Sequence, residues 1–257
     1  MTTEQFSAIE QSIAAFAPAG ETLLAQRMLE QRRDWKFVLP LGLVEQLLEP
    51  LSADYRVVLA AGQPLARYEN HYFDTADLHC YREHHRGRAR RYKVRVRSYL
   101  DREISSLEVK SRDPRRITRK RRLAREFGDL TVQGAAAEEF IAQHCPLRAG
   151  ELRPGLSNSF RRITLVGVHS PERITLDLGL RFAQGGSSRP LSSLAVVEVK
   201  SARSRNGTPV LAHFRRARLR PQGFSKYCVG TALLNEGLRA NRFQRILRQV
   251  ARLEEAA

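Results

Sequence analysis

Alternation of charged and apolar residues over residues 92–110 is the feature that most restricts the fold. In the run YKVRVRSYLDREISSLEVK, Lys93, Arg95 and Arg97 are separated by single valines. Side chains at positions i, i+2 and i+4 share one face of a strand, so this spacing places the three cations on one face and the valines on the other. The run therefore predicts a hairpin with one charged face and one apolar face.

The same alternation recurs in other segments. Glu108 shares a face with Lys110, and in the run AVVEVKS Glu198 shares a face with Lys200. AVVEVKS is short and strongly apolar, which is typical of a central strand. Because an unpaired buried charge is very costly, a central strand that presents Glu-x-Lys predicts an organised, charged cavity. A single such strand is explained more simply by a solvated sheet face, but the repetition favours a barrel with a polar interior.

The charge balance of the chain points to an anionic partner. The 257 residues contain 44 Lys and Arg against 27 Asp and Glu, which gives a formal net charge of +17. Such a charge attracts nucleic acid, an anionic membrane or a polyphosphate over long range. The three scattered cysteines form neither a disulfide framework nor a metal cluster, and they indicate a reducing compartment. The chain shows no signal-peptide pattern and no apolar run of transmembrane length, so we expect a cytoplasmic protein.

Local patterns predict nine or ten strands and several helices. The strand candidates are residues 35–39, 55–60, 67–75, 80–86, 90–99, 103–111, 116–124, 160–168, 172–178 and 194–201, with a Gly/Ser loop at 184–190. The helix candidates are 4–30, in two pieces broken at Pro18, then 41–51, 134–145, 208–219 and 226–253. The strands cluster without strict strand–helix alternation, which excludes a doubly wound parallel sheet and favours an antiparallel α+β domain. We expect an N-terminal helical segment at 1–30 and a single domain at 31–257.

Short motifs follow one another in a fixed order between residues 33 and 230. They are KF at 36–37, YFDT at 72–75, RVR at 95–97, EVK at 108–110, FRR at 160–162, RITLD at 173–177, EVK at 198–200 and FSKY at 224–227. The ordered set resembles the VTC domain, the polyphosphate polymerase branch of the triphosphate tunnel metalloenzymes, within the CYTH-like superfamily. Two departures are mild: Asp34 stands where many relatives have Glu, and Phe160 stands where Tyr is common.

The resemblance implies an α+β fold in which an eight-stranded antiparallel β-barrel forms a tunnel. This tunnel would be open at both ends, basic inside and flanked by helices that include a long C-terminal helix. Members of this branch transfer the terminal phosphate of ATP to a growing inorganic polyphosphate chain with a divalent metal, Mn²⁺ or Mg²⁺.

The resemblance also assigns roles by position. The phosphate-binding residues would be Lys36, Arg95, Arg97, Lys110, Lys120, Arg162, Arg173, Lys200 and Lys226. Of these, the catalytic ones would be Arg95, Arg97, Lys110, Lys200 and Lys226. Glu198 would bind the metal, and Asp177 would be a second acid or a salt-bridge partner. Lys93 lies one step outside the matched motif and is expected at the tunnel mouth.

Two other functions stay open. One is a tunnel triphosphatase that hydrolyses tripolyphosphate or nucleoside triphosphates, and the other is a non-catalytic module that binds polyphosphate or RNA. The basic run at 112–125 permits a nucleic-acid interface or a solvated hairpin, and we expect no specific nucleic acid. The sequence contains no P-loop, and it does not determine the oligomeric state.

Overall fold

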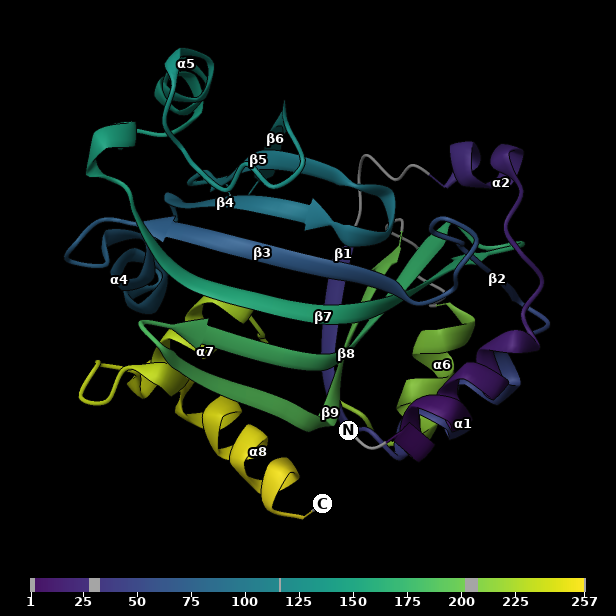
Figure 1. Cartoon of the computed structure of the whole chain (residues 1–257). Coiled ribbons are helices and arrows are strands. Elements are labelled where there is room, and N and C mark those ends of the chain that lie inside the picture. The colour runs from purple at the N-terminus through teal and green to yellow at the C-terminus, as the bar shows by residue number, and fades with distance from the viewer. Residues whose placement is uncertain (1–2, 28–32, 116, 202–207, 257) are drawn as a thin grey trace.

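A single antiparallel sheet dominates the computed structural model, which describes residues 3–27, 33–115, 117–201 and 208–256 (Figure 1). The strands are β1 (Arg33–Pro40), β2 (Tyr55–Val57), β3 (Ala66–Asp74), β4 (Arg91–Tyr99), β5 (Ile104–Arg112), β6 (Thr118–Arg125), β7 (Arg153–Gly167), β8 (Glu172–Gln184) and β9 (Ser187–Ser201). The helices are α1 (Thr3–Ala14), α2 (Glu21–Gln26), α3 (Leu43–Leu48), α4 (His79–Arg86), α5 (Ala135–His144), α6 (Pro209–Arg216), α7 (Lys226–Leu234) and α8 (Gln244–Glu255). Short 3-10 turns occupy Glu49–Leu51, Leu100–Arg102, Ala149–Glu151 and Asn241–Phe243, the last of which is η4.

The sheet confirms the predicted antiparallel α+β fold. Eight strands follow the order β1-β9-β8-β7-β3-β4-β5-β6, and β2 pairs with β7 beside this path. The described residues contain no ladder between the edge strands β1 and β6, so the sheet curls into a tunnel that is not strictly closed. Arg119 and Arg121 on β6 are exposed, and charged side chains are a common protection of an edge strand against further pairing. The inner side of this curl is called the concave face below.

The valines of the opening run are buried on the convex side of the sheet, as the alternation predicts. Val94 and Val96 are fully buried in a cluster with Val109 of β5 and with Phe140 and Ile141 of α5. Figure 1 shows α5 on the outer side of β4 and β5. The helix therefore covers the apolar face, and the cations between the valines point to the concave side.

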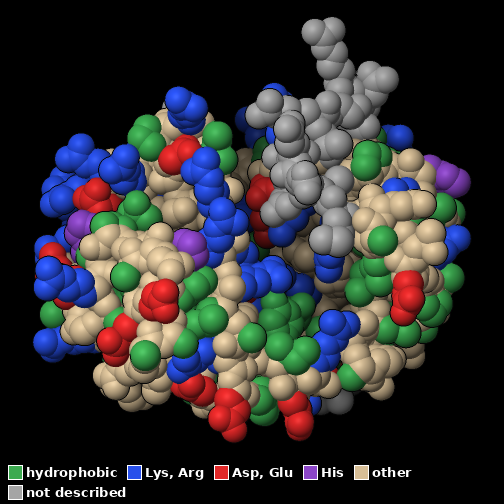
Figure 2. All heavy atoms as spheres, turned by 90° about the horizontal axis from the view of Figure 1, so that it is seen from above, with side chains coloured by type: hydrophobic (Ala, Val, Ile, Leu, Met, Phe, Trp, Pro, Cys, Tyr) green, Lys and Arg blue, Asp and Glu red, His purple; other side chains and the backbone are tan. Residues whose placement is uncertain are grey.

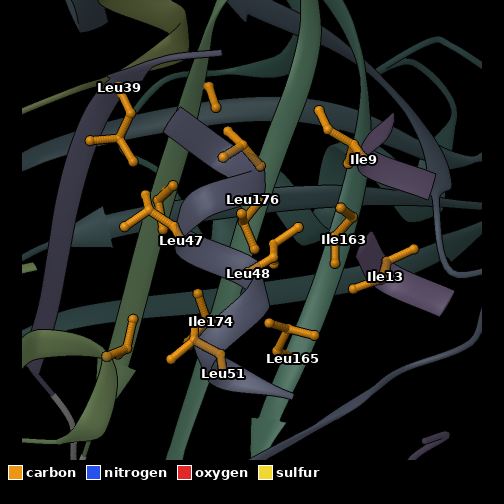
Figure 3. Packing of buried hydrophobic residues seen from close by; sticks show 14 of the residues in the cluster. Ile9, Ile13, Leu39, Leu47, Leu48, Leu51, Ile163, Leu165, Ile174 and Leu176 are labelled. Carbon is orange, nitrogen blue, oxygen red and sulfur yellow. The ribbon is translucent and has the colours of Figure 1, made fainter. Parts of the chain in front are cut away.

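The largest core also lies on the convex side. Ile9 and Ile13 of α1 pack with Leu48 of α3 and with Leu165 and Ile174 of the sheet (Figure 3). α6 adds buried apolar residues to the same cluster. Burial of apolar area at roughly 25 cal/mol per Å² stabilises this side of β1, β7, β8 and β9. The polar faces of these strands consequently turn inward.

One end of the concave face is filled by α7. Tyr227 and Val229 pack with Phe160 and Val196, which occupy the concave side of β7 and β9. The contact is close, because a Cβ at Gly230 would lie 2.5 Å from the Phe182 ring. α7 therefore narrows one end of the tunnel that the family resemblance implies is open at both ends.

Two sequence predictions of secondary structure are wrong. Residues 80–86, expected as a strand, form α4. Asp74 accepts hydrogen bonds from the backbone amides of Cys80 (2.8 Å) and Tyr81 (3.0 Å), and a carboxylate at this end stabilises a helix. The continuous helix expected at 226–253 is α7 and α8, separated by a turn in which Gly237 has φ +78°.

Strand ends also differ from the sequence predictions. The loop expected at 184–190 is a two-residue turn, because Gly185 (φ +55°) and Gly186 (φ +82°) adopt the left-handed conformations that tight hairpins require. β7, β8 and β9 are correspondingly longer than predicted, and β2 is shorter. The two N-terminal helices are confirmed. Residues 28–30 of the helical prediction at 4–30, and residue 116 of the strand prediction at 116–124, lie outside the described residues.

The close packing of α7 gives a testable prediction. Gly230→Ala places a methyl group against Phe182 and Leu156, so we expect a loss of about 1–3 kcal/mol in the free energy of unfolding, measured by urea denaturation. Gly150→Ala is the matched control, because a Cβ there has no neighbour within 4 Å. Equal stability of the two variants would contradict this packing.

Candidate functional site

The concave face brings together basic residues from most strands of the sheet. The structure places Lys36 on β1, Arg95 and Arg97 on β4, Lys110 on β5, Lys120 on β6, Arg162 on β7, Arg173 on β8, Glu198 and Lys200 on β9, and Lys226 at the first position of α7. Figure 2 shows Lys and Arg side chains in a recess near the centre of one face of the molecule. The contacts of these residues divide them into clusters.

Asp177 is the centre of the first cluster. It lies opposite Arg162 in the β7–β8 ladder, and it accepts hydrogen bonds from Arg162 Nε (2.5 Å) and Nη2 (2.8 Å). Lys226 Nζ binds the same carboxylate. Burial alone would raise the pKa of Asp177, but Arg162 and Lys226 hold it well below its usual range. Asp177 is therefore a salt-bridge partner, and it ties α7 to the sheet.

The aromatic ring of Phe160 contributes to the same cluster. Lys226 Nζ lies 4.4 Å from the centre of this ring, and the Arg162 guanidinium lies 5.1 Å from it. Cations are attracted to the face of an aromatic ring, and Phe provides that attraction as well as Tyr does without a hydroxyl group. The Phe at this position therefore keeps the two cations in place.

Glu108 is the centre of the second cluster. Arg95 donates from Nε (2.8 Å) and Nη2 (2.7 Å) to Glu108 Oε2, and Lys120 Nζ lies 2.5 Å from Oε1. Burial by itself would raise the pKa of Glu108. The charges of Arg95, Arg97 and Lys120 outweigh this effect and lower the pKa to about 2. Tyr72 Oη accepts another hydrogen bond from Arg95 at 3.1 Å. Arg95 is therefore held rigidly, and Lys120 is engaged with the protein itself.

Arg97 has a neutral partner. Its Nε donates to Asn70 Oδ1 (2.7 Å), and Asn70 Nδ2 donates to Asn158 Oδ1 (2.9 Å). Burial and then the charge of Arg95 lower the pKa of Arg97. The two asparagines orient the guanidinium without neutralising it, so its charge is available to an anion. Sequence reasoning did not assign a role to either asparagine, and the only signal for them is their position on the charged faces of β3 and β7.

Glu198 lies among cations from several strands. It is directly opposite Lys36 in the β1–β9 ladder, and its Oε1 is 4.0 Å from Lys200 Nζ. Burial by itself would raise the pKa of Glu198. The charges of Lys36, Lys200, Lys110 and Arg162 outweigh this effect and lower the pKa to about 2. The carboxylate is therefore ionised at neutral pH. Lys36 Nζ also donates to the carbonyl oxygen of Phe224 at 2.9 Å.

The donors on the concave face fit a metal ion that is held jointly with phosphates. The described residues contain no group of three or more His, Cys, Asp and Glu side chains that could hold a metal ion. Asp177 and Glu108 form close ion pairs with arginines, at 2.5 Å and 2.7 Å. Glu198 Oε1 is 4.0 Å from Lys200 Nζ, so Glu198 is the best placed of the three carboxylates to bind a metal ion. Mg²⁺ is commonly bound by one or two carboxylates together with substrate phosphates, and a single glutamate meets that requirement.

The FSKY motif attaches α7 to the sheet through four consecutive residues. Ser225 Oγ accepts from the backbone amide of Cys228 (3.2 Å) and from Lys93 Nζ (2.7 Å), so it caps α7 and holds Lys93. Tyr227 Oη donates to Asp74, and the contacts of Phe224 and Lys226 are those given above. Beside this motif, a cavity of about 980 Å³ is lined by Lys36, Lys93 and Lys110. The structure thus places Lys93 where the tunnel mouth is expected.

Arg173 and Lys200 lie away from this cavity. They are register partners near the β8 start and the β9 end, and β8 continues from Arg173 toward Asp177 on the same face. Lys200 and Lys110 nevertheless both lower the pKa of Glu198, so predicted residues of β9 and β5 converge on this one carboxylate.

The antiparallel sheet with a basic concave face defines a tunnel-fold, phosphate-handling protein. The chain belongs to the VTC domain family, because the model of that family matches residues 31–235. In the part of the chain that the structure describes, no helix is long and apolar enough to cross a membrane.

Solved structures with this fold are distant in sequence. A candidate adenylate cyclase from Bacillus halodurans has a TM-score of 0.52 and 12% identity over 76% of this chain and 94% of its own. A candidate adenylyl cyclase from Hippeastrum, described as having a dominant triphosphatase activity, has a TM-score of 0.49 and 17% identity over 80% of this chain and 98% of its own. A comparison with curated proteins finds no significant match.

Removal of the Asp177 carboxylate tests the first cluster. Asp177→Asn leaves two buried cations without their anion, so we expect a loss of about 3 kcal/mol or more in the free energy of unfolding. The native pKa of Asp177 is lowered, so the difference from the wild type is complete above the unfolded pKa of about 4 and shrinks as the pH falls below it. Asp77→Asn, at an exposed ion pair with Arg82, is the control, with a loss below about 1 kcal/mol. A pH-independent difference would contradict the ion-pair assignment.

Repulsion among the lysines of the cavity predicts proton uptake. Burial lowers the pKa of Lys110, and Lys36 and Lys93 lower it further, although water in the cavity screens the exposed part of Lys110. A long polyphosphate has fully ionised internal phosphates, so its binding raises this pKa and protons enter the complex. Calorimetry in two buffers of different ionisation enthalpy, at about pH 8 where an ordinary lysine is fully protonated, measures the uptake. Lys110→Arg should bind with less uptake, and an enthalpy that does not depend on the buffer in the wild type would refute the repulsion.

Proposed function

We propose that this protein is a polyphosphate polymerase, which transfers the terminal phosphate of ATP to a growing polyphosphate chain inside the tunnel. The observation that carries the proposal is the concave face, on which cations from β1, β5, β7 and β9 surround one ionised carboxylate, Glu198. Membership of the VTC domain family supports it.

The basic residues would act through position and charge. Phosphoryl transfer needs little covalent chemistry from the protein, and its catalysis rests on alignment and on stabilisation of charge spread over the phosphate oxygens. Arg162 and Lys226 form one rigid pair on Asp177, while Arg95 and Arg97 form another on β4. A phosphate chain that lies between the two pairs would have its donor and acceptor groups held in line.

Glu198 would hold the divalent metal, Mn²⁺ or Mg²⁺, together with the phosphates. A bound metal would neutralise charge on the transferred phosphate. Lys36, Lys110 and Lys200 surround the carboxylate and would bind the phosphate oxygens that a metal does not. Because its pKa is lowered, Glu198 stays ionised at neutral pH and would be available as a metal ligand.

The competing function is a triphosphatase, in which water replaces polyphosphate as the acceptor. Asp177 and Glu108 are held by ion pairs with lowered pKa values, which makes them weak general bases. A phosphate acceptor is already ionised and needs no base, so this inventory favours transfer to phosphate over hydrolysis. A module that only binds polyanions would use the same cations. It differs from both enzymes because it would not convert ATP to products.

Incubation of the purified protein with γ-labelled ATP and Mn²⁺ tests the proposal. We expect labelled polymer on a gel, and free phosphate as the main product would support the triphosphatase instead. Glu198→Gln should lower synthesis by about 100-fold or more, because it removes the carboxylate that would hold the charge-neutralising metal beside the phosphates. Arg95→Ala with Arg97→Ala should abolish synthesis.

Arg119→Ala with Arg121→Ala is the matched control. These arginines have the same spacing on β6, and both are exposed. The control pair should retain synthesis near the wild-type rate. Activity that survives loss of Arg95 and Arg97 but not loss of Arg119 and Arg121 would move the reaction out of the tunnel.

A further inference from the structure

Charge compensation ends partway along the β4–β5 hairpin. On the concave face, Arg95 is opposite Glu108, the next pair is Lys93 with Lys110, and the last is Arg91 with Arg112. Like charges directly opposite one another destabilise a sheet. The first pair is an ion pair, while the other two pairs are cation against cation. The hairpin therefore carries a growing excess of positive charge from the tunnel centre to its mouth.

The outermost pair shows this excess directly. Arg112 Nε is buried and has no hydrogen-bond partner among the described residues. Arg91 donates to the carbonyl oxygen of Arg88 (3.1 Å), and its pKa is lowered by burial, by Arg112 and by Arg242. A buried donor without a partner is costly, so these arginines are organised for a ligand that the protein does not itself supply.

Two further arginines approach the same place from the C-terminal part of the chain. Arg242 of η4 lies against Gly87, where a Cβ would come within 2.0 Å of Arg242 Nη1. The missing side chain at Gly87 therefore makes room for the guanidinium. Arg245 of α8 lines the cavity beside it. Segments that are about 150 residues apart in sequence thus deliver arginines to one cavity.

The cavity contains more positive charge than a triphosphate can neutralise. Its described lining includes one acidic residue, Asp34, and seven basic ones, which are Lys36, Arg91, Lys93, Lys110, Arg112, Arg242 and Arg245. Arg91 is four residues from Arg95, a distance of ~13 Å along an extended strand. Three linked phosphates held by Arg95 and Arg97 do not span this distance, whereas a longer linear chain does.

We propose that Arg91, Arg112, Arg242 and Arg245, together called the arginine vestibule, form a second anion subsite that holds the part of a linear polyphosphate beyond its first three phosphates. The subsite makes the protein select chains longer than tripolyphosphate. The inference rests on the proposed function only in that the ligand enters the tunnel. It adds a chain-length preference to that function.

Titration calorimetry with two ligands tests the vestibule. Tripolyphosphate and a size-fractionated longer polyphosphate, both expressed per chain, are titrated into the wild type, Arg242→Gln with Arg245→Gln, and Arg248→Gln with Arg252→Gln. The last pair is the control, because it removes two exposed arginines from the same helical region without touching the cavity lining. Circular dichroism verifies the fold of each variant.

The expected result is specific to the longer ligand. The wild type and the control bind the longer chain more tightly than tripolyphosphate, and the vestibule variant loses about tenfold or more of that difference while its tripolyphosphate affinity is unchanged. Equal weakening for both ligands, or no length preference in the wild type, would overturn the vestibule. An RNA oligonucleotide that bound as tightly through Arg242 and Arg245 would overturn the choice of ligand.

The outcome is distinguishable from that of the proposed function. Polymer synthesis without a length preference would refute the vestibule and leave the polymerase in place. A length preference that depends on Arg242 and Arg245, without synthesis from ATP, would refute the polymerase and leave the vestibule as part of a binding module. Failure of the wild type to bind either ligand would refute both.

Discussion

Compensation of buried positive charge is the constraint on which this structure depends. The concave face carries cations from most of its strands, and two buried carboxylates there each bind more than one of them: Asp177 holds Arg162 and Lys226, and Glu108 holds Arg95 and Lys120. Such clusters are destabilising if one partner is lost, and they fix the direction of each cation. The apolar cores on the convex side of the sheet stabilise the fold and offset the cost of burying these charges.

This compensation is incomplete along the β4–β5 hairpin, and the proposed function uses the positive charge that remains there. Arg97 is oriented by neutral asparagines, and the pairs Lys93–Lys110 and Arg91–Arg112 place like charges opposite each other. These sites lie in a row from the tunnel centre to the cavity beside α7. A linear chain of phosphates supplies negative charge with the same geometry, which links the proposed polymerase to the proposed vestibule through one electrostatic requirement.

The sequence alone predicts the strands and their faces, because alternation of period two is a local signal that the sheet preserves. Val94, Arg95 and Glu198 all face the side expected of them, and the ordered motifs identify the family. The strand expected at 80–86 is a helix because Asp74, several residues earlier, caps it. The asparagine relay to Arg97 and the approach of Arg242 to Gly87 depend on contacts between distant segments, and no local pattern encodes them. The lack of a β1–β6 ladder is likewise a property of the whole sheet.

The most direct measurement of the central claim is a crystal structure of the protein with Mn²⁺ and a non-hydrolysable ATP analogue. The account predicts density for the phosphates on the concave face, in contact with Arg95, Arg97, Arg162 and Lys226, and a metal ion that binds both Glu198 and a phosphate oxygen. Phosphates bound on the outer arginines, with the concave face empty, would contradict it.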